Sequence, residues 1–317
     1  MKRIVILAGA LALLATPAAA EDSLKLAIGQ INNWENQAPT LGQDAGFFKK
    51  HGLVLENYGT AGAGETVQAV ISGSADIGGG VGVAGVMRAY QKGAPVRIIA
   101  PAFTGTSDLY WYVKADSPIK SLKDTTEKNT IAYSTNGSSS NNIVVAFVEE
   151  LGAKAKPTST GSPPATLTSV MSGQIDIGWA APPFGLQEIQ DGKIRIIARG
   201  SDVPSLRGQT VRVLIANANA LKARKDAMVR FMQGYREAVD WMYASPDAVQ
   251  MFSKKTGVAE NLVRDSMNQF QPKETMQTDQ MADLDGAIRD AVKLKFLDAP
   301  LTKEQLADFI QIPPRTK

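Results

Sequence analysis

The feature that most constrains this fold is a nine-residue pattern that occurs twice, 100 positions apart. Residues 70–78 read VISGSADIG and residues 170–178 read VMSGQIDIG, with six identities and a preceding Thr at 66 and 166. The pattern predicts a helix end, a Ser-Gly turn and a short buried strand, since Gly allows turn geometries that a Cβ penalises. Ligands of open α/β sheets bind where strands end. The repeat therefore predicts two lobes facing each other across a cleft.

Strand and helix patterns alternate on both sides of each copy, which is typical of an α/β fold with parallel strands. Expected strands cover 24–28, 53–58, 96–100, 130–133, 194–198 and 211–215, and expected helices cover 40–49, 65–71, 85–92, 143–151 and 221–243. The apolar segment 108–114 and the strand 211–215 predict two crossings between the lobes. We expect residues 21–112 and 213–317 to form lobe 1, residues 113–212 to form lobe 2, and the helical C-terminal part to pack on lobe 1.

The first 20 residues have the pattern of a cleavable secretory signal peptide. Lys2 and Arg3 precede an apolar run over 4–15, and small residues lead to an expected cut after Ala20. The run is too short to span a bilayer. Because no Cys is near the cut, we expect no lipid anchor and a mature protein that is free in the periplasm.

Charge balance and missing residue types disfavour several classes of function. Without residues 1–20 the chain has 32 Lys and Arg (34 less Lys2 and Arg3) against 31 Asp and Glu, so neither nucleic acid nor an anionic membrane is an expected partner. The lack of Cys excludes thiolate metal sites. The single His51 lies at a predicted helix end, badly placed to activate a nucleophile. We expect no catalytic residues, metal or cofactor.

The strongest local signal for ligand binding is the polar run STNGSSSNN at 134–142, between a predicted strand and helix. Unpaired N–H groups and a partial positive charge at a helix N-terminus, with hydroxyls beside them, can hold an oxyanion. Ordinary N-capping is the alternative, although it needs only one such residue. The run matches neither a Walker loop nor a dinucleotide fingerprint. Gly79–Gly82 is the first-lobe counterpart, with a simple tight turn as its alternative.

Aromatic side chains and one Arg are the other candidates. Trp34 and Trp179 each follow a predicted strand end, where they could stack on a flat ligand or pack at the cleft edge. Arg212 alternates with apolar neighbours, so its side chain is expected either to reach an anion in the cleft or to form a structural ion pair. Asp76 and Asp176 occupy equivalent turns and are expected to hold loop backbone rather than to act as an acid–base pair.

The segments GFFKKHGL at 46–53, GSADIG at 73–78 and SPIKSLKD at 117–124 together resemble the periplasmic solute-binding proteins of ABC importers in the nitrate, sulfonate, taurine and thiamine-pyrimidine-precursor group. The resemblance covers essentially the whole mature chain and implies the type II binding-protein fold, with two α/β lobes joined by two crossings. It implies ligand contacts in the loop after the first strand, after each Asp-Ile-Gly and at the second-lobe helix start. Together with Arg212, the expected ligand-binding residues are Asn33, Trp34, Gln37, Gly80, Val81, Asn136, Gly137, Ser138, Ser139, Trp179 and Ala180.

The function implied is delivery of a small organic anion, a sulfonate or an aliphatic or aromatic carboxylate, to an ABC permease in the inner membrane. Binding is expected to close the hinge, and the protein is expected to be a monomer. Two alternatives stay open: a secreted enzyme of the pyrimidine-precursor-synthase type, and a sensory protein that delivers ligand to a membrane receptor. Such enzymes use their own His and a cysteine-rich motif, so one His and no Cys disfavour the first alternative.

Overall fold

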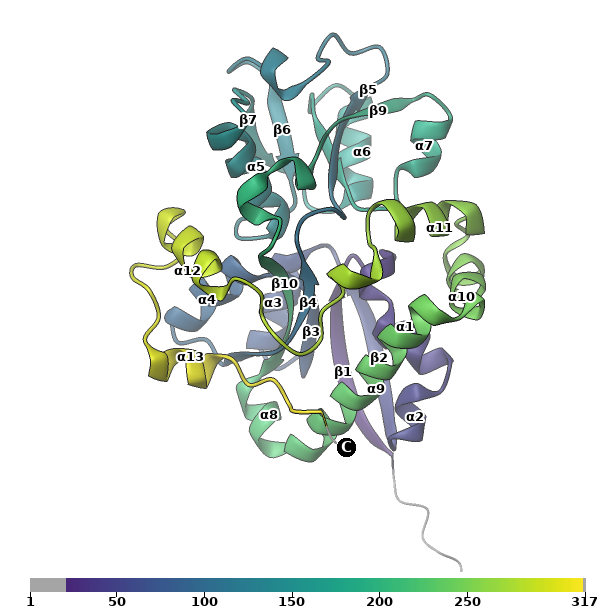
Figure 1. Cartoon of the computed structure of the whole chain (residues 1–317), viewed down its shortest axis with the longest axis vertical. Coiled ribbons are helices and arrows are strands. Elements are labelled where there is room, and N and C mark those ends of the chain that lie inside the picture. Colours follow the sequence, from purple (N-terminus) through teal and green to yellow (C-terminus); the bar gives the residue numbers. More distant parts are fainter. Residues whose placement is uncertain (1–20, 316–317) are drawn as a thin grey trace, which may run out of the picture.

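The computed structural model describes residues 21–315 and shows two α/β lobes, one above the other in Figure 1. The expected signal peptide at 1–20 lies outside the described residues. Between residues 21 and 315 there is no helix long and apolar enough to cross a membrane.

The first lobe is built on a five-stranded sheet in the order β2-β1-β3-β10-β4. Strand β1 runs parallel to β2 and β3, whereas β10 runs antiparallel to both β3 and β4. Strand–helix–strand connections make parallel pairs, and β10 runs in the opposite direction because it returns from the other lobe. The strands are β1 Asp22–Gly29, β2 Leu53–Thr60, β3 Ile77–Gly82, β4 Val96–Thr104 and β10 Thr210–Asn217.

The second lobe repeats this strand order. Its β8-β5-β9 and β6-β7 sheets meet at a bridge between Ile131 and Ile177, so the strands follow one another as β7-β6-β8-β5-β9. The predicted internal repeat is therefore a repeat of structure. The elements are β5 Tyr110–Lys114, β6 Thr130–Tyr133, β7 Lys156–Ser159, β8 Gly178–Ala180, β9 Ile194–Arg199, α5 Ser139–Glu150, α6 Pro163–Met171 and α7 Leu186–Gln190.

Side chains of the two copies make equivalent contacts. Asp76 Oδ2 accepts a hydrogen bond from Lys25 N, and Asp176 Oδ2 accepts one from Thr130 N, each at 2.8 Å. The Thr before each copy pairs its hydroxyl with that of a Thr six residues earlier, at 2.6 Å in both lobes. The turn glycines have φ values of 77° and 78°, which L side chains rarely adopt. The expectation that the two Asp residues hold backbone is confirmed.

The crossings lie at 105–109 and 200–209, which corrects the expected lobe boundaries. Residues 110–112, expected in lobe 1, begin β5 and pair with β8 and β9 of lobe 2. Residues 210–212, expected in lobe 2, begin β10 and pair with β3 and β4 of lobe 1. The apolar runs predicted as crossings are central strands, because a strand with a neighbour on each side and both faces covered is apolar throughout.

Helices cover the first-lobe sheet and differ from expectation at several ends. The expected helix 40–49 is two helices separated at Gly46, whose φ is 85°. The expected helix 221–243 is broken at Arg224. The helices outside the second lobe are α1 Ala38–Asp44, α2 Phe47–Lys50, α3 Ala63–Ile71, α4 Val83–Gln91, α8 Ala218–Ala223, α9 Lys225–Ala244, α10 Pro246–Thr256, α11 Glu260–Gln269, α12 Leu284–Lys293 and α13 Lys303–Phe309.

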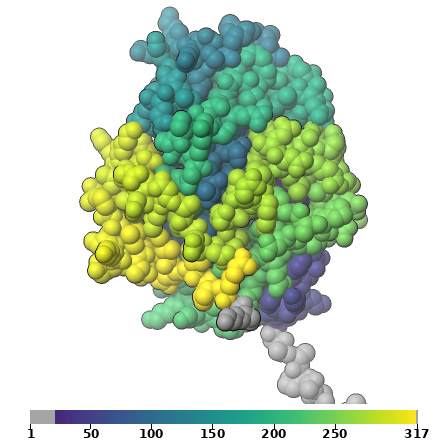
Figure 2. Space-filling view, viewed as in Figure 1, coloured from purple at the N-terminus to yellow at the C-terminus, as the bar shows by residue number. Residues whose placement is uncertain are grey.

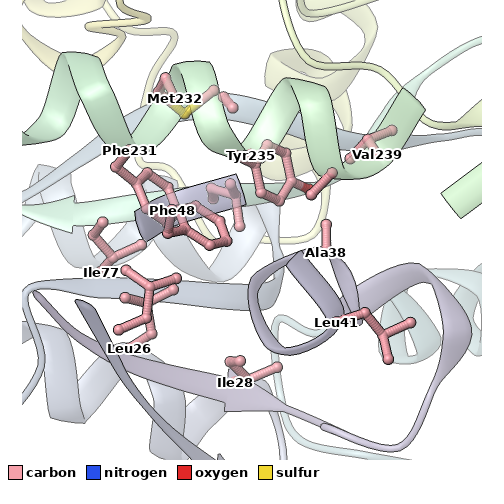
Figure 3. Close-up of a cluster of buried hydrophobic side chains, with 14 of the residues drawn as sticks. Leu26, Ile28, Ala38, Leu41, Phe48, Ile77, Phe231, Met232, Tyr235 and Val239 are labelled. Carbon is pink, nitrogen blue, oxygen red and sulfur yellow. The ribbon is translucent and has the colours of Figure 1, made fainter. Parts of the chain in front are cut away.

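The long helix α9 packs into the main hydrophobic core of the first lobe. Phe231 and Tyr235 of α9 lie with Phe48 and Leu26 in one buried cluster (Figure 3), and the rings of Phe231 and Phe48 stack with centroids 5.6 Å apart. Figure 2 shows the yellow C-terminal residues gathered on the left side of the molecule in this view, below the second lobe. Phe270, after α11, also packs into the second-lobe core. The C-terminal helices thus stabilise the first lobe and touch the second.

Candidate functional site

A small cavity lies between the lobes, where the ends of β1 and β3 face the start of α5 and the strand β8. Its free volume is about 10 Å³, roughly the space of one water molecule. A solute can therefore enter only when the lobes move apart. The lining residues are Gln30, Glu35, Asn36, Ala63, Gly80, Leu109, Ser134, Ser138, Ser139, Ser140, Trp179 and Arg212.

The start of α5 supplies the second-lobe wall of the cavity. Ser138 is the N-cap, and its Oγ accepts a hydrogen bond from Asn141 N at 3.2 Å. Ser140 Oγ accepts one from Ser134 N at 3.0 Å. In the part of the chain that the structure describes, the buried Ser134 hydroxyl has no hydrogen-bond partner. An incoming oxyanion would thus meet a helix N-terminus with a free hydroxyl beside it.

Arg212, on β10, donates hydrogen bonds to side chains of the first lobe, of the first crossing and of the second lobe. Its Nη1 donates to Ser139 Oγ and its Nη2 to Glu35 Oε2, each at 2.8 Å. The same Nη2 donates to Asp108 Oδ2, and the guanidinium carbon lies 4.7 Å from the centre of the Phe103 ring. Of the two alternatives for Arg212 the structural ion pair is present, and Arg212 also lines the cavity, so its contact with an anion stays a prediction.

Burial dominates the electrostatics of this cluster. Burial raises the pKa of Glu35 to about 8; Arg212 opposes this shift and Asp108 adds to it. Burial alone would lower the pKa of Arg212, but the carboxylates of Asp108 and Glu35 outweigh it and raise that pKa above its usual value. Glu35 is therefore the carboxyl group of this cluster that burial biases toward its protonated form.

Direct contacts hold the lobes together around the cavity. Gly85 N of α4 donates to Gly137 O at 3.1 Å. Gln271, after α11, donates from Nε2 to Pro182 O at 2.7 Å, and its Oε1 accepts from the backbone of the Glu35 turn. A Cβ added to Gly82 would lie 2.6 Å from Gly137 O, so the backbones meet where only Gly fits. The structure is that of the closed arrangement.

The structure brings five of the twelve expected ligand-binding residues to the cavity wall. These are Gly80, Ser138, Ser139, Trp179 and Arg212. Their contact with a solute stays a prediction. The other seven do not line the cavity: Asn33, Trp34, Gln37, Val81, Asn136, Gly137 and Ala180.

Trp34 departs most from its expected position. Its side chain is fully buried in the first-lobe core, in edge-on contact with Tyr243 at 6.0 Å and Phe252 at 5.5 Å between ring centroids. The 3-10 turn η1 Trp34–Asn36 directs Trp34 into the core while Glu35 and Asn36 reach the cavity. A loop position alone does not say which way a short turn rotates its side chains.

The remaining six have structural contacts. The side-chain amides of Asn33 and Gln37 donate within their own loop, to Gln30 Oε1 and to a main-chain carbonyl. Val81 and Ala180 belong to the cores of the two lobes. Asn136 and Gly137 line a separate groove of about 320 Å³ between α3, α4 and the second lobe.

The cavity also has lining residues that sequence reasoning missed. They are Gln30, Glu35, Asn36, Ala63, Leu109, Ser134 and Ser140. Glu35 and Asn36 stand in the loop after the first strand, and both serines stand in the polar run at 134–142, so their neighbourhood was visible in the sequence. Asp108, behind Arg212, had no signal of its own. Among residues 21–315, no three His, Cys, Asp or Glu side chains are grouped to hold a metal ion.

Several solved structures share the fold. The alkanesulfonate-binding protein SsuA from Xanthomonas axonopodis pv. citri, bound to MOPS, matches 93% of this chain and 100% of its own, with TM-score 0.75 and 14% identity. The Escherichia coli aliphatic sulphonate binding protein SsuA gives 0.70 and 15% over 93% and 94% of the two chains. The nitrate-binding protein NrtA from Synechocystis PCC 6803 gives 0.67 and 14% over 90% and 84%. These similarities show the periplasmic binding protein fold.

Sequence comparison identifies the family. No curated protein sequence matches the chain. The family model described as NMT1/THI5 like matches residues 36–249, more than half of the chain, and this range includes both copies of the repeat and both crossings. The chain therefore belongs to the NMT1/THI5-like family.

Proposed function

We propose that this protein is the periplasmic solute-binding component of an ABC importer and that its solute is a small organic anion, a sulfonate or a carboxylate. The observation that carries the proposal is that the start of α5 and the guanidinium of Arg212 face one cavity between the lobes. Both groups favour an oxyanion. The similar structures named above are binding proteins, two for sulfonates and one for nitrate.

The mechanism is hinge closure about the crossings 105–109 and 200–209. The empty protein samples an open form that admits the solute, and contacts from both lobes then stabilise the closed form. The near absence of free volume in the closed cavity supports this order of events. The closed monomer presents surfaces of both lobes to the membrane permease.

Isothermal titration of the mature protein tests the ligand class. Ethanesulfonate, benzenesulfonate, benzoate, nitrate and an aminopyrimidine are titrated in turn at neutral pH. The proposal predicts a micromolar or tighter Kd for at least one organic anion, which corresponds to about −8 kcal/mol. Binding of the pyrimidine alone, or of none of the anions, would refute it.

The two alternatives make different predictions. An enzyme of the pyrimidine-precursor-synthase type needs a reactive His at the site, but His51 lies outside the cavity lining, 3.2 Å from Glu237. A turnover assay with pyrimidine precursors distinguishes it. A sensory protein has the same site, and genes for a permease and an ATPase beside this one favour import instead.

A further inference from the structure

We propose that Glu35 determines the charge of the solute that this cleft accepts, by occupying Arg212 when it is ionised and yielding Arg212 to an anion when it is protonated. The inference rests on the proposed function and adds a specificity-determining residue to it. It makes uptake of the solute depend on pH through one carboxyl group.

The first step is the charge of the buried cluster. Arg212 brings one positive charge, and Glu35 and Asp108 bring two carboxyl groups to the same Nη2 atom. All three side chains are nine-tenths or more buried. With both carboxyl groups ionised the cluster has a net charge of −1, which would repel an anion at short range in a low dielectric. An anionic solute therefore needs one carboxyl group to be neutral or displaced.

The second step is that Glu35, and not Asp108, is the carboxyl group that releases Arg212 to the solute. Glu35 lines the cavity, whereas Asp108 is completely buried behind Arg212 and does not line it. Glu35 stands on the turn η1 at the cavity wall, where a solute would touch its side chain. Arg212 keeps Asp108 as its counter-charge and still offers a face to the solute.

The third step concerns the other charged and titratable groups that face Glu35. Arg212 approaches it from β10 and Asp108 from the first crossing. Tyr235 and Tyr243 approach from α9, and burial raises the pKa of both well above the usual value of a tyrosine, so they stay neutral. Burial places the pKa of Glu35 itself at about 8.

The charges of these groups determine whether the affinity for the solute rises or falls with pH. Below pH 8 Glu35 holds its proton and an anion can bind; above pH 8 the ionised carboxylate competes for Arg212 and repels the anion. Affinity should then fall tenfold for each pH unit, and from pH 7 to 9.5 the loss is roughly thirtyfold. A cationic solute would show the reverse dependence.

The experiment measures Kd for ethanesulfonate and benzoate by titration calorimetry between pH 6 and 9.5. It compares the wild-type protein with Glu35→Gln, which keeps the shape but cannot ionise, and with Glu127→Gln, the same change at an exposed position. The wild type and Glu127→Gln should lose affinity above pH 8, whereas the affinity of Glu35→Gln, whatever its value at pH 7, should not change between pH 6 and 9.5. In parallel, the Tm of the ligand-free wild type should fall from pH 5 to 8 relative to Glu35→Gln, because the folded state retains a proton that the unfolded chain releases.

The outcomes separate the inference from the function on which it rests. Anion binding that is independent of pH, or that keeps its pH dependence in Glu35→Gln, overturns the inference and leaves the proposed function standing. Equal Tm profiles of the two proteins also overturn it, since Glu35 would then be ionised in the folded state. Binding of neither anion refutes the proposed function and the inference together.

Discussion

Replacing Gly82 by Ala should hold the cleft open and weaken solute binding. Gly82 ends β3 at the contact between the lobes, and a Cβ there would lie 2.6 Å from Gly137 O and 2.8 Å from Ser139 N. Both atoms are second-lobe backbone, which cannot rotate away as a side chain can. The backbone of Gly82 is extended, with φ −74° and ψ 136°, so Ala fits the open form without strain.

The magnitude follows from the size of the clash. Overpacking by one methyl group at a close-packed contact costs about 1–3 kcal/mol. Because this contact exists only when the lobes close, the cost falls on the closed form and weakens Kd by roughly 5- to 150-fold. Gly64→Ala is a matched control, since its Cβ would also face the second lobe but at 3.4 Å from Thr135, an ordinary contact.

Titration calorimetry with the tightest organic anion gives Kd for the wild type and both variants, and thermal unfolding shows whether they fold. We expect Gly82→Ala to keep a wild-type Tm without solute, to bind more weakly, and to scatter X-rays as an open molecule at solute concentrations that close the wild type. Gly64→Ala should bind like the wild type. Unchanged affinity in Gly82→Ala would show that binding does not require the lobes to meet here.

Four further substitutions test other parts of the structure. Arg212→Ala should cost about 3–5 kcal/mol of unfolding free energy, measured by urea denaturation, since it removes the buried partner of both Asp108 and Glu35; a stability equal to that of the wild type would contradict this. Trp34→Phe should lower stability by about 1–3 kcal/mol but leave Kd unchanged, because Trp34 lies in the core; a large change in Kd would place it at the site after all. Thr66→Val and Thr166→Val should each cost about 1 kcal/mol, because each removes the same 2.6 Å hydroxyl pair in its own lobe, and unequal costs would argue against their equivalence.

Much of the fold could be predicted because the same helix–turn–strand pattern occurs twice in the sequence, at 70–78 and 170–178. The two Asp-Ile-Gly strands occupy the same place in two sheets of the same strand order, and the polar run at 134–142 does begin a helix at the cleft. These features depend on local rules of turn geometry and capping, which a short stretch of sequence contains. Helix α5 starts at Ser139, four residues before the start at 143 that its apolar residues predicted, because residues 139–142 are polar but helical.

The candidate site was harder to predict because it depends on which side of a turn each residue faces. Trp34 and Glu35 are neighbours in one turn, yet Trp34 packs into the core and Glu35 reaches the cavity. Sequence gives no sign that Glu35 is buried, since an acidic residue in a loop is normally exposed. Its partner Asp108 lies 73 positions away, on a crossing whose place was set only by strand pairing.

A crystal structure of the mature protein grown with its tightest organic anion tests the central claim most directly. We predict density for the solute between the lobes, with an oxyanion within about 3 Å of the first α5 amides and of the Arg212 guanidinium. Glu35 should have moved away from Arg212 or donate its proton to the solute. Density elsewhere, for instance in the hollow of about 650 Å³ beside Lys222 and Arg97 at the base of the first lobe, with the interlobe cavity empty, would contradict the account.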